Sequence, residues 1–274
     1  MSSSSASTSA ASSILERIFA AKRAELEVER AAVPLEAIRE AARRAPAPRD
    51  LLAALRAHRP AIIAEIKRAS PSRGDILPGL DPAAVAREYA ASGAAAISVL
   101  TDRHFKGSLE DLRTVRAAVN LPLLRKDFIF DPYQLHQARA AGADGILLIA
   151  AMLNEADLRA LYAAAREIGL QALVEVHNED ELRAAGRAGA EIVGINNRDL
   201  HTFVTDIAVT ERLLKDYRGA ALVVSESGID TPEDIRRLDR AGARAFLIGE
   251  SLLRGGVPRL RLETLCSALV RSEG

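Results

Sequence analysis

The stretch L-P-L-L-R-K-D-F-I-F-D-P-Y-Q-L-H-Q-A-R-A-A-G-A-D-G-I-L-L-I-A, residues 121–150, contains one complete strand–helix–strand pattern. Its two ends, 121–126 and 144–150, are short apolar runs of the kind that forms buried strands. Between them, Asp131-Pro132 has the chemistry of a helix start, and Gly142 lies in an A-G-A turn suited to a helix end. The stretch therefore predicts a βαβ unit with parallel strands.

The same alternation continues in both directions. Further short, often β-branched runs occur at 61–67, 95–101, 170–176, 191–196, 221–226 and 244–249. Most segments between the runs have helical period, and several open with capping residues: Asp81, Ser108, Asn154, Asn178 and Thr231. Eight strand–helix units in about 210 residues predict an α/β fold, the (β/α)8 TIM barrel. A doubly wound open sheet is the alternative, but no G-x-G-x-x-G motif follows the first run.

The residues before the first run form a separate region. Residues 1–13 are Ser-rich and of low complexity, so we expect a disordered tail, and they lack the basic and apolar segments of a secretory signal. Residues 14–58 have helical period, and prolines divide them into about three helices. We expect residues 14–274 to form one barrel domain, with 14–58 as its N-terminal helical extension.

Composition excludes several classes of function. The 274 residues contain 37 Lys+Arg and 37 Asp+Glu, and a chain without net positive charge is a poor nucleic-acid binder. The longest apolar run has nine residues, too few to span a membrane. A single cysteine, Cys266, excludes an internal disulfide and a Cys-cluster metal site, and the five histidines form no metal-binding pair. We expect a cytoplasmic protein without a metal, a nucleic-acid partner or a membrane partner.

Polar side chains gather where the predicted strands end, which is where TIM barrels place their active sites. Closing the sheet would bring two lysines and three glutamates to one mouth: Lys67, Lys126, Glu65, Glu175 and Glu226. A structural ion-pair network, with Glu65 on Lys67 and Glu175 on Lys126, is one interpretation. Such a concentration of charge costs stability, however, whereas it supplies general acids and bases with pKa values that neighbours can move toward neutrality. We therefore favour an active site.

Glycines at the last two strand ends point to the ligand. Ser227-Gly228 and Gly249-Glu250-Ser251 stand where many barrels bind phosphate through exposed backbone N–H groups. A carboxylate repels phosphate, so we expect the Glu250 side chain to point away and to offer only its amide. The sequence thus predicts a small phosphorylated molecule as partner.

Five segments, in order along the chain, closely resemble the indole-3-glycerol phosphate synthase family: I-I-A-E-I-K-R-A-S-P-S (62–72), L-L-R-K-D-F-I-F-D-P-Y-Q (123–134), L-V-E-V-H (173–177), G-I-N-N-R-D-L (194–200) and S-E-S-G-I (225–229). The resemblance covers the chain from the helical leader to the eighth strand. It implies the conversion of 1-(2-carboxyphenylamino)-1-deoxyribulose 5-phosphate into indole-3-glycerol phosphate, carbon dioxide and water in tryptophan biosynthesis. It implies no cofactor, and we expect a monomer or a weak homodimer.

The resemblance also implies roles for individual residues. Lys126 would be the general acid toward the ketone oxygen, Glu175 would be the general base of the dehydration, and Glu65 and Lys67 would position substrate and transfer protons. The implied substrate contacts are Asn196, Arg198 and Ser70 at the anthranilate part, Phe105, Phe128 and Leu147 at its ring, Glu226 and Ser227 at the polar mouth, and Gly228, Gly249, Glu250 and Ser251 at the phosphate. The family's usual serine after Gly249 is Glu250 here.

Chemistry agrees with these roles and leaves alternatives open. A desolvated lysine beside another cation can be tuned to deliver a proton as the ring closes. Which of Lys67 and Lys126 gives the decisive proton stays open, because coupled groups can share that role. A phosphoribosylanthranilate isomerase is the nearest rival, but it would need a cysteine where Glu65 and Lys67 stand. A non-catalytic barrel that senses a phosphorylated ligand is the other.

Overall fold

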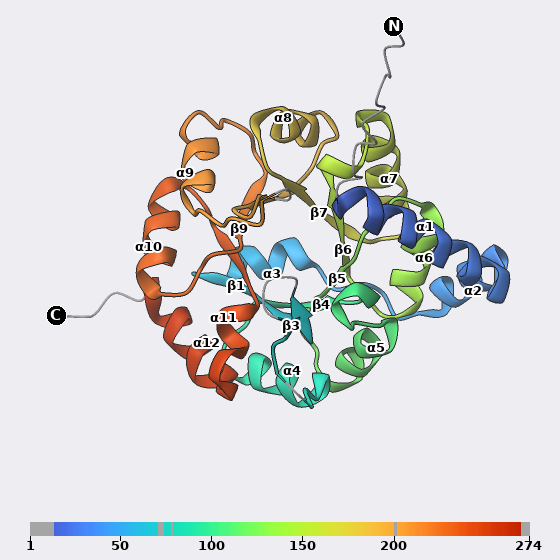
Figure 1. Cartoon of the computed structure of the whole chain (residues 1–274), viewed down its shortest axis with the longest axis horizontal. Coiled ribbons are helices and arrows are strands. Elements are labelled where there is room, and N and C mark those ends of the chain that lie inside the picture. The colour runs from blue at the N-terminus through green and yellow to red at the C-terminus, as the bar shows by residue number, and fades with distance from the viewer. Residues whose placement is uncertain (1–13, 71–73, 78, 200–201, 270–274) are drawn as a thin grey trace, which may run out of the picture.

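The structure is a computed structural model that describes residues 14–70, 74–77, 79–199 and 202–269 (Figure 1). The expected tail at 1–13 lies outside these ranges. Eight parallel strands close into a barrel in the order β1-β10-β9-β8-β7-β6-β5-β4. Their bounds are β1 (Ala61–Ile66), β4 (Ala96–Leu100), β5 (Leu123–Lys126), β6 (Gly145–Ile149), β7 (Gln171–Val176), β8 (Ile192–Asn196), β9 (Leu222–Glu226) and β10 (Ala245–Ile248). Each predicted run contains one of them, and the predicted TIM barrel is confirmed.

Helices form a ring around the strands (Figure 1). They are α4 (Pro82–Ala91), α5 (Leu109–Ala118), α6 (Pro132–Ala140), α7 (Glu155–Glu167), α8 (Glu179–Arg187), α9 (Ala208–Lys215), α10 (Pro232–Ala241), α11 (Glu250–Leu253) and α12 (Pro258–Cys266). The predicted capping is confirmed: Ser108 accepts a hydrogen bond from the Asp111 N–H, and Thr231 forms a capping box with Asp234. Gly142 has φ of 90°, the left-handed backbone that a helix end requires.

The N-terminal region folds into three helices, α1 (Ile14–Ala32), α2 (Leu35–Arg44) and α3 (Leu51–Ala57), as predicted. Helix α3 covers the amino-terminal end of the barrel, because Leu51 and Leu55 are fully buried in the cluster that fills its interior. The Asp50 carboxylate, which caps α3, also accepts a hydrogen bond of 3.0 Å from Gln171 at the start of β7. The bottom of the barrel is therefore closed, and its opposite end remains open to ligand.

Helices α1 and α2 pack outside the ring, beside α6 (Figure 1). The Tyr133 hydroxyl of α6 lies 3.2 Å from the Glu29 carbonyl and 2.8 Å from the Val33 carbonyl, which fixes the end of α1. One feature escaped prediction, an antiparallel pair formed after the first barrel strand by β2 (Ala69–Ser70) and β3 (Gly74–Asp75). Strands of two residues are too short to show a hydrophobic period.

Candidate active site

A cavity of about 340 Å³ opens at the carboxyl ends of the barrel strands. Fifteen of the sixteen predicted site residues line it: Glu65, Lys67, Phe105, Lys126, Phe128, Leu147, Glu175, Asn196, Arg198, Glu226, Ser227, Gly228, Gly249, Glu250 and Ser251. The sixteenth, Ser70, belongs to β2, and its side chain lies outside the described part of the chain. Barrel closure thus gathers residues that are scattered over 187 positions of sequence.

Four charged side chains form one layer at the bottom of this cavity. Glu65, Lys126, Glu175 and Glu226 come from β1, β5, β7 and β9, which are alternate strands of the barrel. Side chains from alternate strands share a layer in a TIM barrel, and such layers are ordinarily apolar. Here the three carboxylates are nearly inaccessible, with 1–5 % of each side chain exposed. We call Glu65, Lys126, Glu175 and Glu226 the charged layer.

The Lys126 ammonium is the centre of the charged layer. Its Nζ lies 2.7 Å from Glu226 Oε2 and 3.2 Å from Glu175 Oε2. Glu65 takes a different partner, since its Oε1 lies 2.9 Å from Lys67 Nζ. Both ion pairs that the sequence suggested are present, and Glu226 is an additional partner of Lys126.

Burial and neighbouring charges set the protonation states of the layer. Burial alone would lower the pKa of Lys126, but Glu226, Glu175 and Glu65 together raise it well above its usual value. The pKa of Lys126 is therefore shifted away from neutrality, not toward it as the sequence suggested. The sequence interpretation relied on another cation beside this lysine, whereas the folded chain surrounds Lys126 with carboxylates.

The carboxylates respond unequally to the same cation. Burial would raise the pKa of Glu175, yet Lys126 and His177 hold it well below its usual value. Burial and the charge of Glu175 raise the pKa of Glu226 to about 7, although Lys126 opposes the shift. Burial would also raise the pKa of Glu65, and attraction to Lys67 and Lys126 lowers it. Near neutral pH Glu226 is the carboxyl of the layer that exchanges a proton most readily.

Two glycines make the room that the buried carboxylates occupy. A Cβ at Gly194 of β8 would overlap Glu226 Oε1, and a Cβ at Gly249 would lie 2.5 Å from Glu65 Oε1. Gly194 belongs to β8, which lies between β7 and β9, and Gly249 follows β10, which lies between β9 and β1. Both glycines therefore lie between strands that carry the charged layer. Gly249 therefore serves the position of Glu65 as well as the loop after β10.

We expect Gly249→Ala to lower kcat/KM about tenfold or more, because the new Cβ would push the Glu65 carboxylate from Lys67 and a misplacement of about 1 Å is costly in catalysis. Gly186→Ala is the matched control, since nothing lies within 4 Å of its Cβ position on α8. Steady-state kinetics of both variants check the prediction. Equal activity of the two would show that Glu65 tolerates the displacement.

The cavity has an apolar wall and a glycine-lined wall on opposite sides. Phe128 follows β5 and Leu147 belongs to β6, and the Phe128 ring stacks on Phe105 with centroids 6.5 Å apart and planes at 26°. Gly228 and Gly249 follow β9 and β10, which face β5 and β6 across the barrel. An aromatic group and an anionic group of one ligand would thus be held apart.

Glu250 does not point away from the site. Its carboxylate lies 4.0 Å from Arg198 Nη2 and 3.6 Å from Arg254 Nη2, and all three residues line the cavity. The expectation of an outward side chain is wrong, because two guanidinium groups attract the carboxylate inward. The Ser251 hydroxyl is engaged with the protein too, donating a hydrogen bond of 2.9 Å to the Ile229 carbonyl.

Sequence reasoning missed two supporting residues. Buried Asn197 donates hydrogen bonds of 3.0 Å to Ser225 Oγ and to the Ser227 carbonyl, so it fixes the loop after β9. His177 lies 3.3 Å from Glu175 and 3.1 Å from Glu181. Burial would lower the pKa of His177, but hydrogen bonds with both glutamates raise it to about 10. The dense E-x-H-x-x-x-E spacing was the available signal for this cation.

The described residues offer neither a metal-binding cluster nor a membrane-spanning helix. No group of three or more His, Cys, Asp and Glu side chains there is arranged to hold a metal ion. No helix among the described residues is long and apolar enough to cross a membrane.

A closed parallel barrel with lysines and carboxylates at its mouth defines a (β/α)8-barrel enzyme. The family profile described as "Indole-3-glycerol phosphate synthase" matches residues 15–265. A relative of that name from Roseiflexus sp. (strain RS-1) is 54% identical over 250 residues, 88% of this chain and 93% of its own. Another, from Chromobacterium violaceum, is 48% identical and covers 93% of this chain and 98% of its own. The chain belongs to the indole-3-glycerol phosphate synthase family, a family of carboxy-lyases in tryptophan biosynthesis.

Similarity to solved structures extends to distant barrels. The thiamine phosphate pyrophosphorylase from Pyrococcus furiosus aligns with a TM-score of 0.58 at 17% identity, over 80% of this chain and 97% of its own. The N-acetylmannosamine-6-phosphate 2-epimerase from Clostridium perfringens aligns with the same TM-score over 74% of this chain and 90% of its own. At these identities the likeness concerns the fold alone.

Proposed function

We propose that the protein is an active indole-3-glycerol phosphate synthase that converts 1-(2-carboxyphenylamino)-1-deoxyribulose 5-phosphate into indole-3-glycerol phosphate, carbon dioxide and water. The observation that carries the proposal is the charged layer, in which one ammonium, that of Lys126, is shared by Glu175 and Glu226 beneath the cavity. The reaction needs a proton donor and a proton acceptor close to the same few atoms, and the layer supplies both.

Ring closure is the step for which Lys126 is best suited. The ring carbon that bears the carboxylate attacks the ketone carbon, and the carbonyl electron pair moves onto oxygen. The Lys126 ammonium donates a proton to that oxygen. Loss of carbon dioxide then leaves an electron pair that the iminium nitrogen accepts as the ring regains aromaticity, so the step needs no added cofactor.

We assign the dehydration step to the carboxylates of Glu175 and Glu226. The new hydroxyl takes a proton from the Lys126–Glu226 pair and leaves as water, and a base removes a proton from the adjacent ring position. Glu175 is the proposed base, since attraction to Lys126 and His177 keeps its pKa low and the group ionised. Glu226, with its pKa raised to about 7, can hold the transferred proton between steps. Glu65 and Lys67 are proposed to position the substrate and to assist proton transfer.

Both ends of the flexible substrate have a place in the cavity. We assign the aromatic ring to Phe105, Phe128 and Leu147, its carboxylate to Asn196, Arg198 and Ser70, and the phosphate to Ser227, Gly228, Gly249, the Glu250 amide and Ser251. The Arg198 Nε donates a hydrogen bond of 3.2 Å to Thr205, which leaves other guanidinium N–H groups for an anion. Two anchored ends favour the folded conformer that reacts.

Incubation of the protein with the carboxyphenylamino deoxyribulose phosphate, followed by indole fluorescence, tests the proposal. Time-dependent appearance of the indole signal together with one equivalent of carbon dioxide is expected. Folded protein that binds the substrate without converting it would support the sensor alternative. Isomerisation of phosphoribosylanthranilate instead would identify the rival enzyme.

We also propose that residues 14–274 act as one barrel domain with 14–58 as its extension, as a monomer or weak homodimer in the cytoplasm. The large apolar side chains that are strongly exposed in the described ranges are few: Val28, Val33, Leu35, Val204, Val257 and Leu260. Few exposed apolar groups suit a chain without an extensive permanent interface. A charged sugar phosphate does not cross membranes unaided, so an enzyme that uses it is expected in the compartment where the sugar phosphate is made. We propose that this compartment is the cytoplasm.

A further inference from the structure

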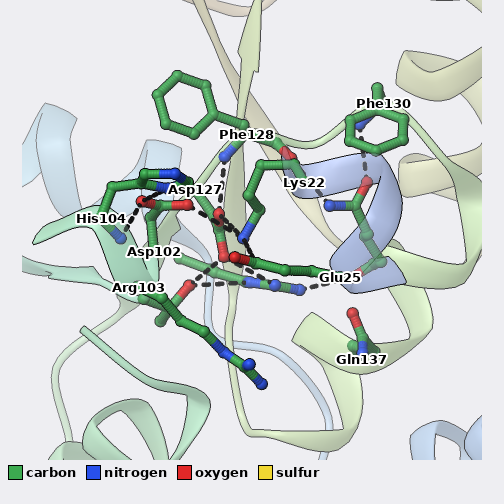
Figure 2. A network of polar contacts seen from close by, with 12 residues as sticks. Lys22, Glu25, Asp102, Arg103, His104, Asp127, Phe128, Phe130 and Gln137 are labelled. Atoms are coloured by element: carbon green, nitrogen blue, oxygen red, sulfur yellow. Dashed lines mark hydrogen bonds and ion pairs between the residues drawn. The ribbon is translucent and has the colours of Figure 1, made fainter. Parts of the chain in front are cut away.

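A buried lysine of the N-terminal extension reaches the mouth of the barrel. Lys22, on α1, lies 3.1 Å from Asp102 and 3.0 Å from Asp127, and only 7 % of its side chain is exposed. The two aspartates follow β4 and β5 and are nearly inaccessible themselves, with 0 % and 1 % exposed. Figure 2 shows the Lys22 ammonium among the carboxylates of Asp102, Asp127 and Glu25.

Each aspartate holds the backbone of a segment that carries an aromatic wall residue. Asp102 Oδ1 accepts a hydrogen bond of 2.8 Å from the His104 N–H and so caps the 3-10 turn Arg103–Phe105. Asp127 Oδ1 accepts one of 2.9 Å from the N–H of Phe128. Lys22 binds the free oxygen of Asp102 and the same Oδ1 of Asp127. The lysine therefore ties together the two backbone segments from which Phe105 and Phe128 project.

We propose that Lys22 is a positioning residue for the aromatic end of the substrate: it fixes the Phe105–Phe128 wall through Asp102 and Asp127. This proposal rests on the proposed function, because the aromatic ligand is that of the synthase reaction. Lys22 does not line the cavity, whereas Asp127 does, so its action passes through the two aspartates.

The remaining contacts of Asp127 set Lys22 apart from a general stabilising charge. Asp127 has other partners, since Arg125 lies 2.9 Å and Thr101 2.6 Å from its Oδ2. Charge balance alone therefore does not require Lys22 at Asp127. A buried ion pair is in general no more stabilising than well-packed apolar side chains, whereas it does select one geometry in some proteins. The geometry selected here is the spacing of two loops at the cavity.

Lys22→Met, which removes the charge and keeps the length, is expected to lower kcat/KM for the full substrate about tenfold or more, mainly through KM. The double variant Lys22→Met/Asp102→Asn separates positioning from stability. It removes both opposite charges, and the asparagine oxygen can still cap the 3-10 turn. We expect Lys22→Met to have a lower thermal midpoint than the unmodified protein. The double variant should recover part of this difference, while its kcat/KM stays low.

Binding of two probes completes the test. The reduced, alcohol form of the substrate carries the aromatic ring, whereas inorganic phosphate reports only on the glycine-lined wall. In Lys22→Met, measured below its thermal midpoint, we expect weaker binding of the reduced substrate and unchanged binding of phosphate. Equal loss for both probes, or recovery of kcat/KM together with stability in the double variant, would overturn the proposal.

Controls keep this test distinct from that of the function. Lys215→Met makes the same substitution at an exposed lysine of α9 and should leave both affinities unchanged. Failure of the unmodified protein to form indole-3-glycerol phosphate would contradict the proposed function. An active unmodified protein combined with an active Lys22→Met variant would contradict only the role of Lys22.

Discussion

Replacing Lys126 by methionine is expected to lower kcat by about a thousandfold or more, since a positioned general acid contributes about 10² to 10⁴ and this ammonium also organises two carboxylates. The variant removes the only lysine ammonium within 3.2 Å of both Glu175 and Glu226 among the described residues. Binding of the reduced substrate should be largely retained, because the proposed phosphate and aromatic walls do not include Lys126. Single-turnover kinetics and a binding titration measure the two effects separately.

Lys126→Arg sharpens this prediction. An arginine keeps the cation between Glu175 and Glu226 but does not give up a proton near neutral pH. We expect Lys126→Arg to bind the reduced substrate and to remain almost inactive, while Lys215→Met keeps full activity. A normal kcat in Lys126→Arg would mean that the cation acts only by its charge, and proton donation would then pass to Lys67.

Glu226→Gln is expected to stabilise the protein at alkaline pH while lowering kcat. Glu226 has a pKa of about 7 in the folded chain against 4.5 for the ordinary group. Between these values the unfolded chain ionises first, so the carboxyl costs stability that increases from pH 4.5 to 7 and then stays constant. The full cost is about 3 kcal/mol for a shift of this size, and glutamine removes it.

Thermal midpoints measured from pH 5 to pH 8 check this prediction. Glu226→Gln and the unmodified protein should be similar at pH 5, and the variant should gain progressively as the pH rises. Glu167→Gln, on the exposed end of α7, is the matched control and should show no such trend. A constant difference at all pH values would mean that Glu226 titrates with an ordinary pKa.

Local patterns were enough to predict the barrel. The run 170–176 predicted β7 to within one residue. Asn178 indicated the start of α8, because a capping side chain binds a backbone N–H only three residues later. The motif around Lys126 pointed to the site for the same reason, since strand ends meet once the fold is known. Where the interacting residues lie close together in the chain, the sequence alone was enough to predict the structure.

Contacts between distant segments could not be predicted in this way. The charge state of Lys126 depends on Glu226, 100 residues later, and the orientation of Glu250 depends on Arg198 and Arg254. Lys22 showed only a helical period, with nothing to indicate that it meets Asp127. These are tertiary effects. In each of them the fold decides which charges lie close together, and their separation sets the size of the electrostatic interaction.

The position of Lys22 in the chain has a consequence for the order in which the barrel and helix α1 fold. Its partners lie 80 and 105 residues further along, whereas most barrel strands pair with their successors in sequence. Helix α1 contributes no strand to the barrel, so the eight strands can pair and close without it, and α1 can dock afterwards on the loops that follow β4 and β5. On refolding, recovery of activity should therefore lag behind recovery of the circular dichroism signal.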